Sequence, residues 1–354
     1  MAIQNYSTSA SRNLIRAAQG MLEHAQPITV LGDFGTQREM PQNSTDTLVF
    51  RRTLPFGAST LGTTVESSQR YVGTPEVGDG TGFVLSEGVT PDSNTIAFQD
   101  VSVTLQQYGV LFKYSNKVEQ LYEDDIPAEM VKLTGETLAE VMEQVRYGVL
   151  KAGSTVIYAN GSGRAAVGTP ISLNALRKAA RTLESNRARR VTSRLAPGVN
   201  FGTAAVQPAY IVFCHTDAVA DVRNLPDFTK VEAYGSFKPI HDREIGACED
   251  FRFISSPLLK PFPASGANVG STGMLSVGGV KVDVYPFIII GEDAWGQVAL
   301  KGMQAIKPVV LKASQTNHAN PLGQFGFVGA STWFATLRLN DAFMARIEAG
   351  VTAL

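Results

Sequence analysis

The sequence contains little of what disulfide-stabilised and metal-binding proteins require. Its 354 residues include two cysteines, Cys214 and Cys248, and four histidines. Two thiols make no disulfide framework, so we expect both to be free and buried. No histidine lies within four residues of another, and no Cys-x-x-Cys occurs. The spacing typical of a metal site is therefore missing, and the sequence predicts no metal.

Charge is also scarce. Asp, Glu, Lys and Arg make up 18% of the chain, against about a quarter in typical soluble domains. The formal net charge of −1 gives no overall basic field for nucleic acid. A hydrophobic fraction of 44% is ample for a core. This balance suits a protein that buries part of its surface against other copies.

Long apolar runs are absent. No stretch approaches the roughly 18 apolar residues of a membrane span, so no membrane partner is expected. Residues 1–26 lack the basic start and apolar block of a secretory signal.

Catalytic motifs are missing as well. There is no Gly-x-Ser-x-Gly nucleophile elbow. The glycine clusters at 78–82 and 161–168 lack the Lys-Ser/Thr of a phosphate loop and are interpreted as turns. The adjacent carboxylates Glu249/Asp250 and Glu292/Asp293 would point to opposite faces of a strand and share no proton. We therefore expect no cofactor and no catalytic site, and an unrecognised α/β enzyme is only a third alternative.

The most informative segment that is present covers residues 54–112. It is polar, rich in Gly and Thr, and free of lysine before Lys113. Strand-like runs alternate with turn signals, which predicts an extended hairpin loop. A long loop that cannot bury itself usually has a function. Its partner is predicted to be a neighbouring copy, which makes a shell-building protein the first hypothesis.

Local signals predict the remaining elements. Acidic residues at 123–125 before Pro127 start a long helix that runs to about Lys151, with Gly153 as its stop. A second helix starts near Ser172. Short helices are expected at 12–23, 217–224 and 341–348. Strands are expected at 47–52, 65–71, 96–112, 209–213, 251–255, 280–290, 306–311 and 327–339. The apolar stripe of the long helix is Val131, Leu138, Val141, Met142, Val145 and Val149.

Several stretches, read in this order of elements, resemble the major capsid proteins of tailed bacteriophages. They are TLVFRR at 47–52, QYG at 107–109, IIGEDAWG at 289–296, and the segment 329–348 with its WFA and RIE runs. The resemblance implies the α+β Hong Kong-type capsid fold, which encapsulins share. It implies an N-terminal arm (1–53), an extended loop (54–107), a peripheral domain (108–165 and 301–354) with a long spine helix, and an axial domain (166–300).

The resemblance also implies a function. The chain would assemble with itself, as hexamers and pentamers, into the icosahedral head shell that encloses double-stranded DNA. It would be located in the virion after assembly in the host cytoplasm. A portal and a possible decoration protein would be partners. A separate scaffolding protein is also expected, because the arm is short and has no sustained heptads. An encapsulin-like compartment around a cargo enzyme is the alternative.

Some members of this fold weld their subunits through a lysine in the extended loop. The first lysine here is Lys113, which the sequence places at the base of the loop, so that chemistry has no donor at the tip. Basic residues that could meet DNA or another subunit are Arg12 and Arg16 on the arm, and the cluster Arg187, Arg189, Arg190 and Arg194. For the cluster, a solvated loop or an acidic neighbour such as Glu232 or Asp242 is equally compatible with the sequence.

Overall fold

The computed structural model describes residues 29–43, 45–53, 85–90, 98–121, 126–196, 202–234, 238–270, 273–301, 307–316 and 320–354. Four sequence predictions lie wholly or largely outside these residues. They are the helix at 12–23 with Arg12 and Arg16, the strand at 65–71, the glycine cluster at 78–82, and most of the extended loop predicted at 54–107.

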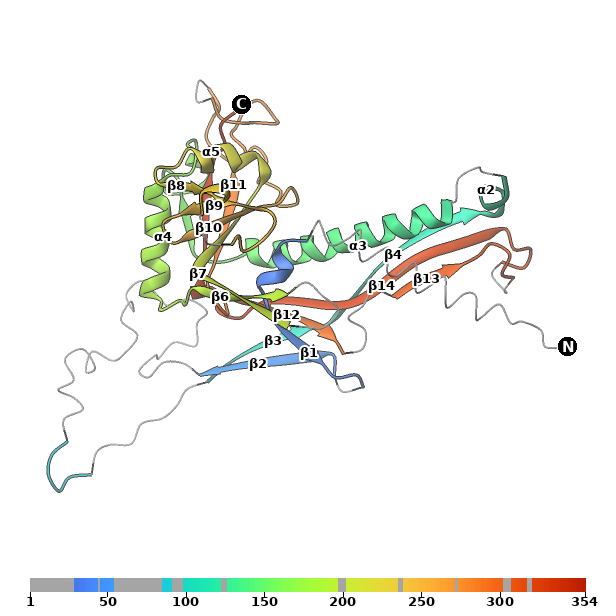
Figure 1. Ribbon diagram of the computed structural model, residues 1–354, viewed down its shortest axis with the longest axis horizontal. Helices are drawn as coiled ribbons and strands as arrows, with labels where there is room; N and C mark the ends of the chain where they lie inside the picture. The colour runs from blue at the N-terminus through green and yellow to red at the C-terminus, as the bar shows by residue number, and fades with distance from the viewer. Residues whose placement is uncertain are drawn as a thin grey trace.

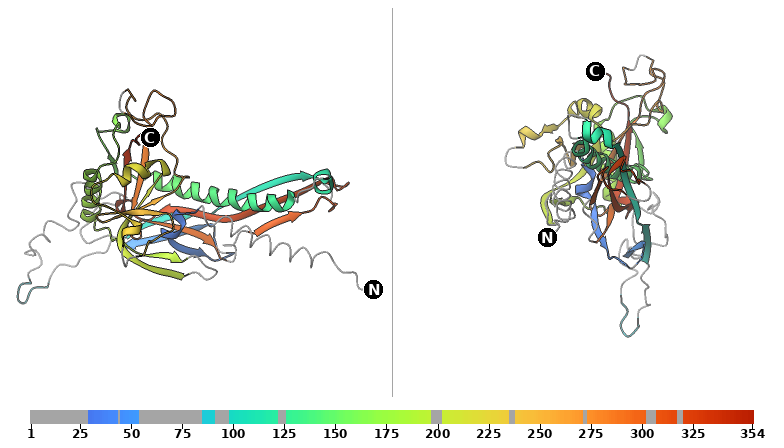
Figure 2. Two further views of the ribbon diagram at one scale, coloured as in Figure 1. Left: turned by 45° about the horizontal axis from the view of Figure 1, so that its top comes forward. Right: turned by 90° about the vertical axis from the view of Figure 1, so that its right-hand side faces the viewer.

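Two sheets and one long helix organise the described residues (Figure 1). A large sheet lies at one end of the molecule, with short helices around it. The long helix α3 (Ile126–Lys151) runs away from that end, alongside the strands of a small sheet. The view in Figure 2 shows the same elongated arrangement from a second direction. The prediction of an α+β chain with a long spine helix is confirmed.

The large sheet has eight strands in the described part of the chain, in the order β5-β15-β11-β7-β10-β9-β8, with β6 paired to β7. Its strands are β5 (Val156–Tyr158), β6 (Val191–Ala196), β7 (Gly202–Cys214), β8 (Phe228–Lys230), β9 (Glu244–Cys248), β10 (Phe251–Ser255), β11 (Tyr285–Ile290) and β15 (Met344–Ala349). The helices α4 (Leu173–Ser185) and α5 (Val219–Arg223) accompany it.

The central strands of this sheet are buried on both faces. Every residue of β11 and β15 is buried. One face packs against α4 through Leu176, Ala179 and Leu183. The other face meets the end of α3 and the 3-10 turn Leu31–Phe34. Such burial on both sides explains the continuous apolar run at 287–290, which has no polar alternation.

The small sheet has five strands in the described residues, in the order β1-β12-β14-β13, with β4 paired to β14. Its strands are β1 (Thr36–Met40), β4 (Gln106–Ser115), β12 (Trp295–Leu300), β13 (Lys307–Leu311) and β14 (Phe325–Arg338). The short helix α2 (Asn116–Leu121) follows β4. One face of this sheet packs on α3 through Tyr114, Val131, Leu138, Val328 and Ala330.

A separate ribbon of two strands, β2 (Thr47–Thr53) and β3 (Phe98–Thr104), pairs from Thr47 with Thr104 to Thr53 with Phe98. The predicted alternation is confirmed, because Val101, Val103 and Leu105 face inward while Ser102 and Thr104 are exposed. The strand expected at 96–112 is divided at Leu105 into β3 and β4. Leu48, Phe50 and Val103 of the ribbon pack on the cluster around Met40 and Val298, so the hairpin has a rigid base.

The predicted helix at 341–348 is wrong. A 3-10 turn at Asp341–Phe343 leads directly into β15, which pairs with β11 along its whole length. The strand carries two charged residues, Arg346 and Glu348, and both are buried. In the structure Glu348 is fully buried and accepts from Arg164 Nε and Nη2, both at 2.7 Å, and its Oε1 lies 2.9 Å from Arg346 Nε. The paired charges allow the strand to be buried.

The expected boundaries of the peripheral and axial domains remain predictions. The sheets divide the chain differently at three places. β5 and β15 fall within the ranges expected for the peripheral domain, yet they belong to the large sheet. β12 falls within the expected axial range and belongs to the small sheet.

The boundaries of the long helix are confirmed, but its predicted buried stripe is only partly correct. Val131 and Leu138 are buried, whereas Val141, Met142, Val145 and Val149 are half-buried. The polar residues Glu143 and Arg146 are buried instead. Their partners explain why.

Glu143 holds the chain that precedes the small sheet against the long helix. Its Oε1 accepts from the backbone N–H of Val30 (3.0 Å) and of Leu31 (2.8 Å). Arg146 donates to Glu143 Oε2 (3.3 Å) and to Gln297 Oε1 (3.1 Å) of β12. Burial lowers the pKa of Arg146, and the nearby Glu143 opposes that effect. One buried carboxylate therefore links α3, residues 30–31 and, through Arg146, the small sheet.

Removing this carboxylate is expected to destabilise the chain strongly. Glu143→Ala leaves two backbone donors and the Arg146 guanidinium buried without their partner, which costs about 3–5 kcal/mol. Glu143→Gln retains an acceptor and should cost less. The exposed Glu140→Ala on the same helix is the matched control and should stay within about 0.5 kcal/mol. Urea unfolding of the unassembled chain measures all three. Equal midpoints for Glu143→Ala and Glu140→Ala would contradict this account.

Candidate assembly surfaces

The described residues contain few groups arranged for chemistry. No group of three or more His, Cys, Asp or Glu among them could hold a metal ion. None of the helices that the structure describes is long and apolar enough to cross a membrane. Both cysteines are free and buried, as expected. Burial raises the pKa of Cys214 to about 12 and also raises that of Cys248.

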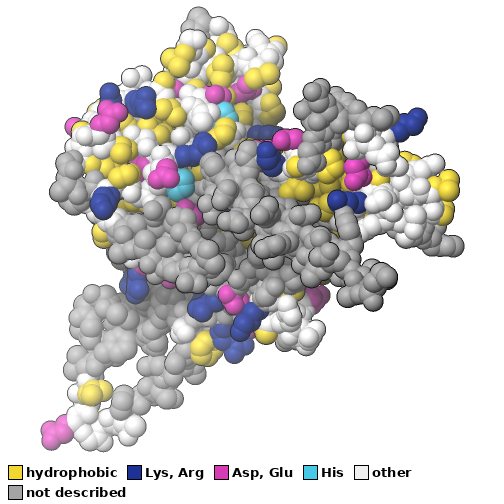
Figure 3. All heavy atoms as spheres, turned by 45° about the vertical axis from the view of Figure 1, so that its right-hand side comes forward, with side chains coloured by type: hydrophobic (Ala, Val, Ile, Leu, Met, Phe, Trp, Pro, Cys, Tyr) yellow, Lys and Arg dark blue, Asp and Glu magenta, His cyan; other side chains and the backbone are white. Residues whose placement is uncertain are grey.

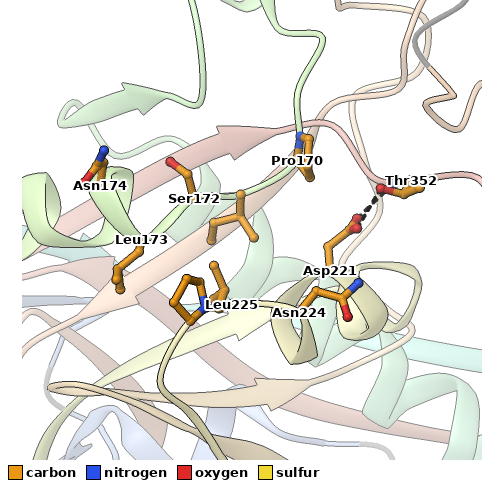
Figure 4. A pocket seen from close by; sticks show the side chains of 10 residues that line it. Pro170, Ser172, Leu173, Asn174, Asp221, Asn224, Leu225 and Thr352 are labelled. Atoms are coloured by element: carbon orange, nitrogen blue, oxygen red, sulfur yellow. Dashed lines mark hydrogen bonds between the residues drawn. The ribbon is translucent and has the colours of Figure 1, made fainter.

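A pocket of about 570 Å³ lies between the start of α4 and α5 (Figure 4). Asp221 is the one carboxylate in its lining, and it accepts from Thr352 N (2.8 Å) and Thr352 Oγ1 (2.7 Å). The Ser172 hydroxyl caps α4 by accepting from Ala175 N. These polar groups hold the C-terminal segment and the helix in place, so their role in the pocket is structural.

The paired carboxylates lie in turns, which corrects the prediction that they sit on strands. Glu249 and Asp293 adopt positive φ values of 51° and 54°. Glu249 binds Arg177 Nε (2.8 Å), and Asp293 accepts from the Thr36 hydroxyl (2.8 Å). Each acid has its own partner, so neither pair shares a proton.

The arginine cluster is placed in part. Arg187 has a positive φ of 58° in the turn after α4, and Arg194 lies in β6. Arg190 binds Asp250 Oδ2 (2.9 Å) and Glu184 Oε1 (3.5 Å) of its own chain and lies over the Tyr210 ring. Glu292 N donates to the backbone carbonyl of the exposed Arg189 (2.9 Å). Arg190 therefore serves a structural role within its own chain.

The glycine-rich segment at 161–168 forms turns, in agreement with the sequence interpretation. Its Arg164 binds the buried Glu348 and lies 3.5 Å from the centroid of the Phe262 ring. This segment therefore belongs to the packing between the end of α3 and the large sheet.

The ribbon is stiffened by pairs across its strands. Arg51 and Asp100 form a bidentate pair, with Nε–Oδ1 2.7 Å and Nη2–Oδ2 2.8 Å. The hydrogen bond and charge of Arg51 lower the pKa of Asp100. Arg52 Nε donates to Gln99 Oε1 at 2.7 Å. These contacts join the two strands of the ribbon, which lies beside β1 and β12 (Figure 1).

Large apolar side chains are exposed at several places in the described residues. Three of these places are the turn at 85–90, the small sheet near its distal end, and the loop around Val277 and Val280, and others are Val49 and Phe98 of the ribbon and Leu133 of α3. Figure 3 shows the first of these as an isolated projection that carries apolar and acidic side chains. Sequence reasoning did not name these residues. The alternation along 106–115 was the one signal that could have indicated the sheet face.

An elongated chain with a projecting ribbon, exposed apolar side chains at its extremities and no catalytic constellation in the described residues has the form of a shell subunit. The model of a family described as "Phage capsid protein" matches residues 97–310. The chain belongs to this family of phage capsid proteins. A comparison with curated protein sequences gives no significant match.

Solved structures show the same fold. The chain is similar to the capsid of Ralstonia phage GP4, with 11% identity and a TM-score of 0.59 over 89% of this chain and 87% of that one. It is similar to the cyanophage Pam1 capsid, with 11% identity and a TM-score of 0.58 over 94% and 93%. For the capsid of cyanophage P-SCSP1u the values are 13%, 0.55, 92% and 89%. The predicted phage capsid fold and capsid role are confirmed, and the encapsulin alternative is not favoured.

We expect both thiols to resist labelling in the folded chain. The thiolate is the reactive form, and a pKa of about 12 in place of 9.0 makes Cys214 roughly a thousandfold less ionised at neutral pH. Labelling with a thiol reagent should need urea. Ser86→Cys, in the exposed turn, is the control and should react at once. Rapid reaction of the wild-type folded chain would show that the large sheet opens.

Proposed function

We propose that this chain is the major capsid protein of a tailed phage. It assembles as hexamers and pentamers into the icosahedral head shell that encloses the double-stranded DNA genome. The observation that carries this proposal is the match to the capsid family over residues 97–310, on a chain whose exposed apolar groups lie at its extremities. Each contact between copies can be weak, because a closed shell repeats it many times.

In this proposal the ribbon and residues 54–97 form the extended loop, which reaches a neighbouring copy. A hairpin arm of about 20 residues spans roughly 65 Å, which is enough to cross an adjacent subunit. The small sheet with α3 forms the peripheral domain, and the large sheet forms the axial domain around the five- and six-fold positions. The chain has a structural role, with no reaction and no cofactor of its own.

The proposed partners besides other copies are a portal, a separate scaffolding protein, a possible decoration protein and the packaged DNA. Assembly takes place in the host cytoplasm, and the product is the virion. The arm at 1–53 supplies Arg12 and Arg16 toward the DNA. Arg187, Arg189 and Arg194 are the second candidates for a contact with DNA or with another subunit, while Arg190 already has acidic partners in its own chain.

Assembly tests the proposal directly. The purified chain should form hollow particles, tubes or hexamer-sized rings in electron microscopy. Thr53 and Phe98 are paired across the ribbon, so residues 54–97 can be replaced by Asn-Gly, which suits a two-residue hairpin turn. This variant should fold with an unchanged melting temperature and form no closed shells. A wild-type chain that stays monomeric at high concentration would overturn the capsid role. Normal shells from the variant would overturn the role of the extended loop.

DNA binding by the empty shell should be weak and sensitive to salt. The net charge is −1, so attraction depends on a few local cations, and phosphate contacts weaken steeply as salt rises. Arg12→Ala/Arg16→Ala should lower DNA retention by empty shells without blocking assembly. Arg187→Ala/Arg189→Ala is the comparison that tests the cluster. Tight, salt-resistant binding would contradict the proposal.

A further inference from the structure

Three cations gather around one aromatic ring at the C-terminal end of α3, where the helix meets the large sheet (Figure 1). Lys151 Nζ lies 3.8 Å from the centroid of the Phe262 ring. Arg164 Cζ lies 3.5 Å from the same centroid, and Arg346 Cζ lies 6.0 Å from it. Two backbone hydrogen bonds between Phe262 and Val284, of 2.8 and 3.0 Å, hold the ring in place. The long helix, a 3-10 turn and β15 each supply one of the three charges.

One carboxylate serves these three cations. Glu348 is fully buried and accepts from Arg164 Nε and Nη2, both at 2.7 Å. Its Oε1 also lies 2.9 Å from Arg346 Nε, but that buried nitrogen forms no hydrogen bond within the described residues. In the same part of the chain no carboxylate lies within ion-pair distance of Lys151 Nζ. The cluster therefore has more positive charges than negative ones and more donors than acceptors.

The end of the helix does not account for Lys151. A lysine in this position usually interacts with the last carbonyl groups of its helix. Two arginines already do so here, because Arg346 donates to Lys151 O and Arg338 Nη1 donates to Ala152 O at 2.5 Å. Burial lowers the pKa of Lys151, and the charges of Arg164 and Arg346 lower it further. The cluster thus lacks an anion.

The remaining donors of the cluster can be reached from solvent. The Arg164 side chain is 34% exposed, and Lys151 is partly exposed. Glu348 occupies two N–H groups of the Arg164 guanidinium, which carries five, and the ammonium group of Lys151 carries three. Arginine and lysine both bind phosphate. A tetrahedral oxyanion accepts from several directions at once, so a phosphate group fits these donors better than a planar carboxylate.

We propose that Lys151, Arg164 and Arg346 form a binding site for a phosphate group at the C-terminal end of α3. Inorganic phosphate and the backbone phosphates of DNA present this same chemistry, and the experiment below distinguishes them. The inference goes beyond the proposed function, because the site belongs to the single chain and exists whether or not the chain forms a shell.

A phosphate titration of the full-length, unassembled chain tests the site. Phosphate at a hundredfold excess over its dissociation constant should raise the melting temperature by about 3 °C, because it binds only the folded chain. Potassium chloride at the same ionic strength should give no such rise. Lys151→Met keeps the apolar stem of the side chain and removes its charge, so it should weaken phosphate binding about tenfold. Lys151→Arg should retain most of the binding.

Lys113 provides the matched control. Its Nζ lies 3.7 Å from the centroid of the Phe325 ring, and no arginine shares that ring within the described residues. Lys113→Met therefore removes a lysine from an aromatic ring without touching the cluster, and the effect of phosphate should not change. The structure also corrects the expectation that Lys113 marks the base of the loop. Thr53 and Phe98 form that base, whereas Lys113 lies near the far end of β4.

A short DNA duplex distinguishes the two sources of phosphate. If DNA supplies the group, the duplex should compete with inorganic phosphate for the chain. Lys151→Met should then lower the slope of log affinity against log salt by about one, and Lys113→Met should not. Phosphate binding without competition from the duplex would assign the site to the free anion. Both outcomes support the site.

Three results would count against the site. The first is an equal change of melting temperature in phosphate and in chloride. The second is a phosphate effect that persists undiminished in Lys151→Met. The third is a Lys151→Met chain that forms no particles while phosphate fails to stabilise the wild-type chain, which would show that a carboxylate of another copy supplies the anion. Particle formation by the wild-type chain is scored separately, so failure of the site is distinguishable from failure of the capsid role.

Discussion

The buried carboxylate of Glu143 is the constraint on which the arrangement of this chain depends. It binds the backbone at residues 30–31 and, through Arg146, reaches Gln297 in β12. The Gln297 amide in turn donates to Gly32 O at 2.8 Å. The start of the described chain, the long helix and the small sheet are therefore joined in one closed network. Such a network is stabilising only when every member has a partner.

A second buried carboxylate fixes the C-terminal end of the long helix. Glu348 in β15 meets Arg164 and Arg346, and Arg346 also donates to Lys151 O at the end of α3. The Phe262 ring lies between Lys151 (3.8 Å) and Arg164 (3.5 Å). The helix is thus held at both of its contacts with the sheets, which gives a stiff body. Stiffness matters in a shell subunit, since small angular errors add up around a closed surface.

The rigid body presents its unsatisfied groups at its extremities. The Arg51–Asp100 ion pair joins the two strands of the ribbon. The part of β4 and β13 that the ribbon does not cover leaves Leu111, Val309 and Lys113 exposed. These exposed side chains do not stabilise a monomer. Within an assembly the same groups provide contacts that can be weak one at a time and strong in number.

Local signals in the sequence determined the parts of the fold that depend on near neighbours. Acidic residues before Pro127 and the stop at Gly153 gave the bounds of α3, and Ser172 marked the start of α4. The same holds for β10 and the inward face of β3. The polar, lysine-free loop and the scarcity of charge were sufficient to favour a shell protein over an enzyme.

Tertiary structure alone decided the features that depend on distant partners. The segment 344–349 is a strand because β11 and β5 lie beside it and Arg164 neutralises Glu348, 184 residues away in the sequence. Glu143 and Arg146 can be buried because Val30 and Gln297 supply their hydrogen-bond partners. These partners lie 113 and 151 residues away, so the sequence near the helix does not reveal them. The sequence left the partner of Arg190 open, and in the structure Arg190 binds Asp250 of the same chain. The uncovered face around Lys113 could not be foreseen, because which side α3 covers is settled only when helix and sheet pack together.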